Sequence, residues 1–189
     1  MCACYILCAV MQTLRVINMM RTVRARPKVR LDLEGLHRAL GGRLYQGRPE
    51  MLLVPMTNGR RIQIFRGGSV QILGRLPHAE AEAMRDELMR RLRGLSTPLL
   101  RILRTTPLEI SNLVLQARFP PPRLKHAASN KHVFCEAEIF PAVLIRRWAP
   151  AHVAVFHNGK IIITGVKSQD SCESLLTDLK TFLQIKPNP

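Results

Sequence analysis

The sequence predicts an α+β protein made of two direct repeats, each with an antiparallel sheet and a long amphipathic helix. A strand that ends in Phe, a Gly turn and a second strand occur twice, as "IQIFRGGSVQILGRL" at 62–76 and "VAVFHNGKIIITGVKS" at 153–168. Each copy follows another apolar strand and precedes an apolar stripe at helical spacing. We match Asn18 with Asn112, Met51 with Phe140 and Phe65 with Phe156, at offsets of 94, 89 and 91 residues.

The elements of the first repeat follow from local signals. Leu33, Leu36 and Leu40 fall on one face of a short helix, and Gly94 is suited to end a long one. The turn "TNG" joins two apolar strands as a hairpin. We therefore expect strands at 17–23 and 49–56, the strand pair of 62–76, and helices at 31–40 and 78–95.

The second repeat shows the same order. Ser168 is a suitable N-cap for a helix whose apolar stripe runs from Cys172 to Leu183. The turn "APA" forms the hairpin. The expected elements are strands at 111–119 and 138–148, the strand pair of 153–168, and a fainter helix at 122–129. We divide the chain into an extension at 1–13, the first repeat at 14–96, a connection at 97–107 and the second repeat at 108–186.

Alternation along the strands predicts a sheet with one open face. In the second repeat Val153, Val155, Ile161 and Ile163 point toward the helices, and the residues between them point away. That second face is also apolar and carries an aromatic ring, although two long helices are too few to cover it. An exposed apolar face on a basic protein indicates a binding surface.

Charge favours a polyanionic partner. The chain has 29 Lys and Arg against 13 Asp and Glu, a formal net charge of +16. The excess is spread over both halves, as on a folded basic surface. Nucleic acid and an anionic membrane surface both fit this charge, and we favour nucleic acid. A basic protein without such a partner is the plain alternative.

Several other classes lack support in the sequence. The five cysteines form no disulfide framework or zinc motif, and the apolar start "CACYILCAVM" is too short for a membrane span. Lipidation of the N-terminal cysteines is left open. The six His are scattered, and no carboxylate cluster or phosphate-cradling loop suggests an enzyme. We expect no catalytic residues, metal or cofactor.

The stretch "EIFPAVLIRR…VAVFHNGKIIITGVK" resembles the second repeat of the TATA-box-binding protein family. The resemblance extends over about residues 14–186, strongly in the second repeat and weakly in the first. It implies a saddle with pseudo-two-fold symmetry, in which one curved antiparallel sheet carries helices on its convex face. The concave face would lie in the minor groove of DNA, where apolar side chains unstack base steps and bend the duplex.

The resemblance also implies DNA-contacting residues. It places wedge phenylalanines at Phe65, Phe140 and Phe156, with Met51 in the fourth wedge position and Pro141 in the family's Phe-Pro pair. Arg146 matches an arginine that contacts phosphate, and we match it with Thr57 in the first repeat. Core packing and turn chemistry are the structural alternatives for the phenylalanines and asparagines. The remaining implied DNA contacts are Asn18, Met20, Gln71, Leu73, Asn112, Val114, Lys160, Ile162, Thr164 and Lys167.

Partner-binding residues follow from the same resemblance. Glu136 and Glu138 match an acidic segment that meets transcription factor IIB, and Arg85, Arg90 and Arg91 lie on a helix whose back face meets regulators in the family. Solvated surfaces are the alternative for both groups. The implied function is a non-enzymatic initiation factor, monomeric on A·T-rich promoter DNA. Its partners would be TFIIB-like and TFIIA-like factors and RNA polymerase, in the nucleus or at a site of viral transcription.

Two other functions stay open. The first repeat departs from the family at Met51, Thr57, Gln71 and Leu73, which fits a scaffold of the preinitiation complex without TATA specificity. An accessory part of a DNA-repair or RNA-cleaving enzyme is the third reading, and no catalytic constellation favours it.

Overall fold

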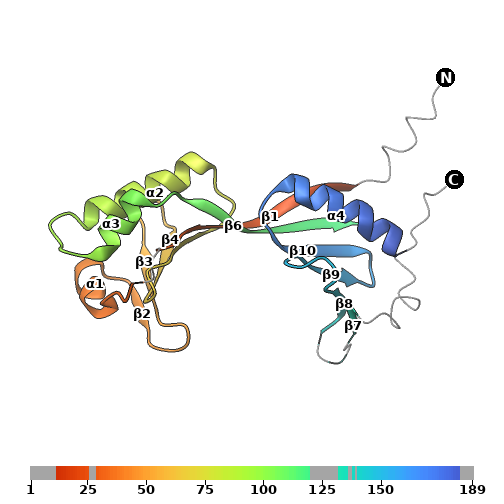
Figure 1. Ribbon diagram of the computed structural model, residues 1–189, viewed down its shortest axis with the longest axis horizontal. Coiled ribbons are helices and arrows are strands. Elements are labelled where there is room, and N and C mark those ends of the chain that lie inside the picture. The colour runs from red at the N-terminus through yellow and green to blue at the C-terminus, as the bar shows by residue number, and fades with distance from the viewer. Residues whose placement is uncertain (1–11, 26–28, 120–131, 136–137, 139, 184–189) are drawn as a thin grey trace, which may run out of the picture. The chain divides into compact units, whose positions relative to one another are not determined.

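The computed structural model describes residues 12–25, 29–119, 132–135, 138 and 140–183 (Figure 1). Contacts divide the chain into two compact units. Met19–Ser111 forms one, called here the N-terminal unit. Asn112–Pro189, together with Met1–Asn18, forms the other, called here the C-terminal unit. The expected repeat boundaries of 14–96 and 108–186 remain a prediction.

The N-terminal unit has five antiparallel strands in the order β2-β3-β4-β5-β1. Figure 1 shows α2 and α3 along one side of this sheet. The elements are β1 Gln12–Val23, whose last residues belong to this unit, α1 Leu33–Leu40, β2 Arg43–Tyr45, β3 Met51–Pro55, β4 Arg61–Phe65, β5 Val70–Leu73, α2 His78–Arg91 and α3 Pro98–Thr105.

The C-terminal unit repeats this strand order as β7-β8-β9-β10-β6. The helix α4 packs against β10 on one face of the sheet (Figure 1). The elements are β6 Glu109–Arg118, β7 Val133–Phe134, β8 Ala142–Ile145, β9 His152–Phe156, β10 Lys160–Val166 and α4 Gln169–Phe182. The α+β class and the repeated topology are therefore confirmed.

Each unit has its own core between its sheet and its helices. Leu52, Ile62 and Ile64 of the N-terminal unit are 0% exposed and pack with Leu88 of α2. In the C-terminal unit Val153, Val155, Ile161 and Ile163 are likewise 0% exposed, as the strand alternation predicted. Both long helices begin and end at positions 91 residues apart. The repeats therefore bury equivalent faces.

Local signals explain most helix boundaries. The side chain of Asp32 accepts a hydrogen bond from the backbone N–H of Gly35 and starts α1. Ser168 caps α4 in the same way through the N–H of Ser171, as predicted. The helix α2 ends at Arg91, earlier than the expected residue 95, and Gly94 follows in a left-handed conformation with φ +84°. The expected helix at 122–129 lies outside the described residues.

Candidate nucleic-acid interface

The C-terminal unit exposes one face of its sheet, which we call its open face. Alternate strand residues Ala154, Phe156, Ile162 and Thr164 are half-buried on this face, while their neighbours along the chain are in the core. Ala154 lies directly opposite Ile162, and Ile162 lies opposite Gln116 of β6. The face is thus a largely apolar, only partly covered surface, as the sequence predicted.

An aromatic pair stands at one end of this open face. The rings of Phe140 and Phe156 meet edge to face, with centroids 5.9 Å apart. Phe140 is 40% exposed, and Phe156 is half-buried. The ammonium group of Lys160 lies 5.7 Å from the Phe156 ring centroid. A core phenylalanine would be far more buried than Phe140, so this end of the pair is accessible from solvent.

Asn112 has a fixed side-chain orientation on β6. Its Oδ1 accepts a hydrogen bond of 2.7 Å from the backbone N–H of Gly165, at the bulge in β10. Because a backbone N–H can only donate, the oxygen must face Gly165, and the amide NH₂ group points elsewhere as a donor. Asn18 is exposed on β1.

Strand register decides which residues of the two repeats correspond. Met51 pairs with Phe65, and Ala142 pairs with Phe156. Met51 therefore corresponds to Ala142, whereas the counterpart of Phe140 is Pro49. The match of Met51 with Phe140 is therefore wrong by two residues. It follows the apolar character of the two side chains, whereas the strand pairing is visible only in the structure.

The same register corrects the match of Arg146. Pro55 pairs with Arg61, and Ile145 pairs with Val153. At the constant offset of 91 residues, Arg146 corresponds to Pro55 and not to Thr57. The predicted matches of Gln71 with Ile162, Leu73 with Thr164 and Met20 with Val114 agree with the register.

The N-terminal unit has a corresponding open face of different composition. Phe65 and Met51 lie opposite each other, and Leu73, 38% exposed, lies opposite Met20. Gln71 lies opposite Gln63 in the middle of the face. This face therefore has Phe65 opposite Met51 and a polar centre, where the C-terminal unit has a pair of phenylalanines and an apolar centre.

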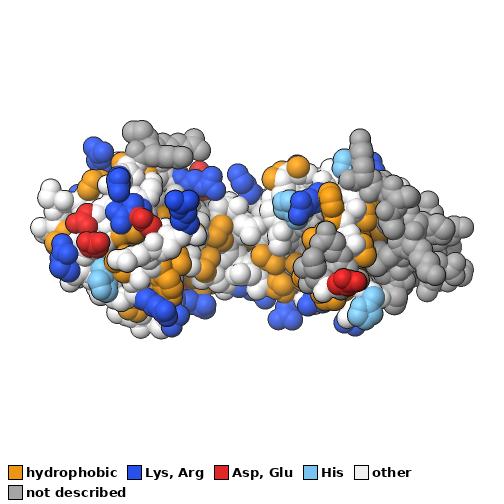
Figure 2. All heavy atoms as spheres, turned by 90° about the horizontal axis from the view of Figure 1, so that it is seen from below, with side chains coloured by type: hydrophobic (Ala, Val, Ile, Leu, Met, Phe, Trp, Pro, Cys, Tyr) orange, Lys and Arg blue, Asp and Glu red, His pale blue; other side chains and the backbone are white. Residues whose placement is uncertain are grey.

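Basic side chains border both open faces. The guanidinium group of Arg146 lies 5.0 Å from the Phe134 ring centroid, and Lys167 is exposed just after β10. Figure 2 shows hydrophobic side chains with Lys and Arg groups around them on the surface of each unit. This combination suits an anionic ligand with apolar surface. Pro141, beside Phe140, is exposed as well.

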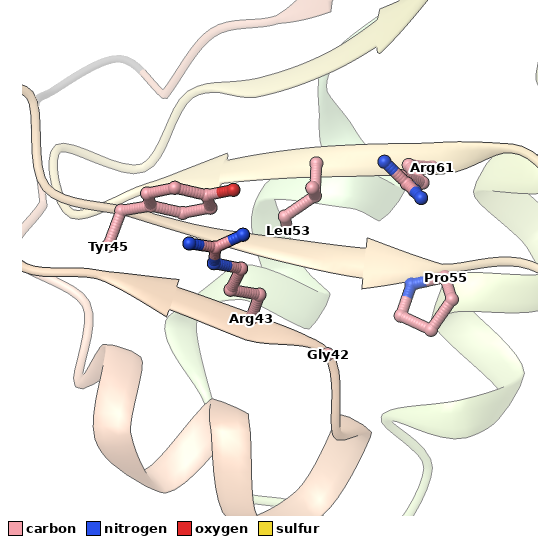
Figure 3. Close-up of a pocket in the computed structure, with 6 residues that line it drawn as sticks. All are labelled: Gly42, Arg43, Tyr45, Leu53, Pro55 and Arg61. Atoms are coloured by element: carbon pink, nitrogen blue, oxygen red, sulfur yellow. The ribbon is translucent and has the colours of Figure 1, made fainter.

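A cavity of about 250 Å³ at the outer edge of the N-terminal open face was not predicted (Figure 3). Arg43 and Tyr45 of β2 and Arg61 of β4 surround it, and their side chains are drawn with Leu53 between them. The Arg43 guanidinium lies 4.8 Å from the Tyr45 ring centroid. Alternation in "RLY" would have shown that Arg43 and Tyr45 share a face, but three residues are too few to predict a strand.

The arginines predicted to bind partners have different roles. Arg85 donates to the carbonyl of Leu103 and so ties α2 to α3. Arg91 donates to the carbonyls of Pro55 and Leu40. Both side chains are engaged within the unit, and their role in binding a partner stays a prediction. Arg90 is exposed on α2.

The acidic segment is described only in part. Glu138 is exposed, and Glu136 lies outside the described residues. The role of this segment in binding a TFIIB-like factor can therefore be discussed in the structure only for Glu138.

Other site types find no geometric support within the described ranges. No group of three or more His, Cys, Asp or Glu there could hold a metal ion. No described helix is long and apolar enough to cross a membrane. Cys135 is a free, exposed cysteine, while Cys172 is buried in α4. Burial, aided by the charge of Glu173, raises the pKa of the Cys172 thiol to about 11.

Comparisons with known proteins agree with this geometry. Residues 107–185 match the family model described as "Transcription factor TFIID (or TATA-binding protein, TBP)". No curated protein sequence matches the chain. The solved structure of Methanococcus jannaschii TBP is similar with a TM-score of 0.68 and 23% identity, over 92% of this chain and 99% of that one. The chain therefore matches the sequence model of this family in its second half, and it has the fold of a TATA-binding protein over most of its length.

Proposed function

We propose that this TATA-binding-protein-like transcription factor binds A·T-rich promoter DNA in the minor groove through its open faces. It bends the duplex and recruits a TFIIB-like factor, with a TFIIA-like factor and RNA polymerase as further partners. It acts as a monomer on DNA and without catalysis, in the nucleus or at a site of viral transcription. The proposal rests on the family, the net charge of +16 and the composition of the open faces.

The chemistry of the open faces suits A·T pairs. In the minor groove A·T pairs present only acceptors, whereas a G·C pair adds the guanine amino donor. Ala154, Ile162 and Val114 offer that donor no acceptor, so burying it would cost free energy. The NH₂ group of Asn112 is a donor suited to the acceptors of A·T pairs.

The observation that carries the proposal is the partly exposed pair of Phe140 and Phe156. A wedge must be apolar, accessible and rigidly supported to enter a base step. Phe140 is 40% exposed and rests against the Phe156 ring, whose strand is held in register by β8 and β10. The pair thus meets all three conditions.

Affinity for A·T-rich and G·C-rich duplexes of equal length, measured at one salt concentration, tests the proposal. We expect tighter binding to the A·T-rich duplex, and we expect Phe140→Ala to reduce this preference. Leu95→Ala is the matched control, because Leu95 is 38% exposed and lies just after α2, outside the open face. Equal affinity for the two duplexes would mean that binding is only electrostatic.

The alternative is a scaffold of the preinitiation complex without TATA specificity. It is favoured by the first repeat, where Pro49 stands in place of a wedge Phe and Gln71 in place of Ile162. In that case the charge of the chain would still attract DNA, but base composition would not matter. The comparison of duplexes therefore separates the two functions.

Recruitment of a TFIIB-like factor is tested at Glu138. We expect Glu138→Lys to weaken capture of such a factor while DNA affinity stays equal or rises, because a positive charge replaces a negative one. Asp170→Lys, an equal charge change at an exposed position in the first turn of α4, is the control. Unchanged capture would mean that Glu138 is only a solvated surface residue.

A further inference from the structure

The first repeat lacks the arginine that the second repeat has at the end of its hairpin strand. Register places Pro55 where the second repeat has Arg146. The lysine positions of the second repeat, Lys160 and Lys167, correspond to Ser69 and Leu76 at the same offset. At the positions that match Arg146, Lys160 and Lys167, the N-terminal open face therefore has no cation that could contact a phosphate group.

Two arginines on neighbouring strands flank the position of Pro55. Arg61 pairs directly with Pro55, and Arg43 pairs with Leu53, two residues earlier on the same strand. All four side chains therefore lie on the open face of the sheet. Since β2 and β4 are separated by β3 and the two positions differ by two residues along the strands, the two arginine backbones are about 12 Å apart. Their side chains line one cavity (Figure 3).

The arrangement has a parallel in the C-terminal unit. There Arg146 lies over the ring of Phe134, which pairs with Leu144. In the N-terminal unit Arg43 occupies the place of Phe134, since it pairs with Leu53, the counterpart of Leu144. Arg43 in turn lies over the ring of Tyr45. Each unit thus has an arginine held over an aromatic ring at the edge of its open face, although from different strand positions.

Neither arginine of this cavity is neutralised within the unit. Arg60 and Arg66 pair with Glu80 and Glu50, whereas in the described part of the chain no carboxylate lies within salt-bridge distance of Arg43 or Arg61. Both arginines are exposed. The floor of Leu53 and Pro55 and the half-buried Tyr45 ring add apolar surface. A ligand with a negative charge next to an apolar body fits this cavity.

We propose that Arg43, Tyr45 and Arg61 form a phosphate-binding subsite for the DNA backbone on the first repeat. The two guanidinium groups bracket phosphate oxygens, and Tyr45 holds Arg43 in place and contacts the adjoining sugar. The subsite replaces the contact that Pro55 cannot make. This inference rests on the proposed function, and it adds three residues to the DNA-binding surface.

The test is the salt dependence of DNA affinity. Each phosphate contact contributes about 0.9 to the slope of log K against log salt concentration. For Arg43→Ala/Arg61→Ala we expect the slope to fall by about 1.8, so the loss of affinity between 50 and 200 mM salt shrinks about tenfold. The loss should be similar for A·T-rich and G·C-rich duplexes, because phosphate contacts carry no base information.

Three further variants separate the subsite from general charge and from folding. Arg101→Ala/Arg104→Ala removes two exposed arginines from α3, away from the open face, and should leave the slope unchanged. Arg43→Lys/Arg61→Lys keeps both charges and should keep most of the slope. Tyr45→Leu should weaken binding in the wild-type background but not beside Arg43→Ala, if the ring acts by positioning Arg43.

Failure of the phosphate-binding subsite can be told apart from failure of the proposed function. If the wild-type chain prefers A·T-rich DNA but both double alanine variants change the slope equally, the subsite is refuted and the proposed function stands. If the wild-type chain shows no preference for A·T-rich DNA, the proposed function fails. If the wild-type chain does not bind DNA, both fail.

Discussion

At the scale of single residues, strand pairing decides what each side chain can do. Phe140 and Pro49 hold the same place beside Phe156 and Phe65, and Arg146 and Pro55 hold the same place at the strand end. One repeat thus has an exposed aromatic ring and a cation where the other has two prolines. These differences could not be read from the apolar pattern, because Met51, two residues from Pro49, matches the pattern equally well.

Cys172 gives a prediction at the same scale. Burial raises the pKa of this thiol from 9.0 to about 11, whereas Cys135 is exposed. Since the thiolate is the nucleophile, we expect Cys135 to react with iodoacetamide quickly and Cys172 only after unfolding. Mass spectrometry of peptides from the native and urea-unfolded protein measures both rates. Equal rates in the native protein would contradict the burial of Cys172.

The same thiol affects stability at high pH. The folded-state pKa lies above the unfolded value, so the unfolded chain loses this proton first as pH rises. The contribution of Cys172 to stability is therefore complete below pH 9 and declines between pH 9 and about 11. We expect Cys172→Ala to make the free energy of unfolding fall less steeply over that range. Identical pH dependence in the variant would argue against a shifted pKa.

At the scale of elements, the two long helices are attached to their hairpins by different chemistry. Glu87 of α2 is 7% exposed and accepts hydrogen bonds from the backbone N–H and the hydroxyl of Thr57. The corresponding places in the C-terminal unit are held by Asp178 and Trp148, and Trp148 packs edge to face on Phe182 at 5.7 Å. A polar attachment in one repeat is thus replaced by an aromatic one in the other.

This difference predicts an asymmetric response to the same substitution. Glu87→Ala should lower the free energy of unfolding by about 2 kcal/mol, because it leaves donors of Thr57 without their charged acceptor. Asp178→Ala, at the equivalent but exposed position, should change it by less than about 0.5 kcal/mol. Urea unfolding followed by circular dichroism measures both. A larger loss for Asp178→Ala would contradict the polar attachment.

Sequence periodicity predicted the long elements and missed the short ones. The helices at 31–40 and 78–95 and the strands around Phe65 and Phe156 have enough residues to show a period, and all are present. The strands β2 and β7 have only three and two residues, which is too few to show a period. The helix α3 was treated as a connection, although Thr97 and Pro98 supply an N-cap and a first-turn proline.

Prediction of the candidate site was also limited where its residues lie on strands too short to show a period. The residues of the second repeat came from a motif that is continuous along the chain, and the family model matches the same region. The cavity of Arg43, Tyr45 and Arg61 joins three strands, so only their pairing brings its residues together. For Arg85 and Arg91 the sequence shows the charge but not the backbone carbonyls that the side chains reach.

At the scale of the whole molecule, the two repeats differ in the side chains that they offer to DNA. The second repeat keeps the aromatic pair, an apolar centre and Arg146, whereas the first keeps Phe65 and gains an arginine cavity. We therefore expect the second repeat to supply most of the bend and most of the base preference. The first should contribute mainly salt-dependent affinity.

Bending of a doubly labelled A·T-rich duplex, followed by fluorescence transfer with affinity read in the same titration, tests this account most directly. The wild-type chain should bend the duplex, Phe156→Ala should remove most of the bend, and Met51→Ala should remove little of it, because Met51 corresponds to Ala142 and not to a wedge. If Phe156→Ala leaves both bend and affinity unchanged, the open face does not wedge DNA, and the scaffold function replaces the one proposed.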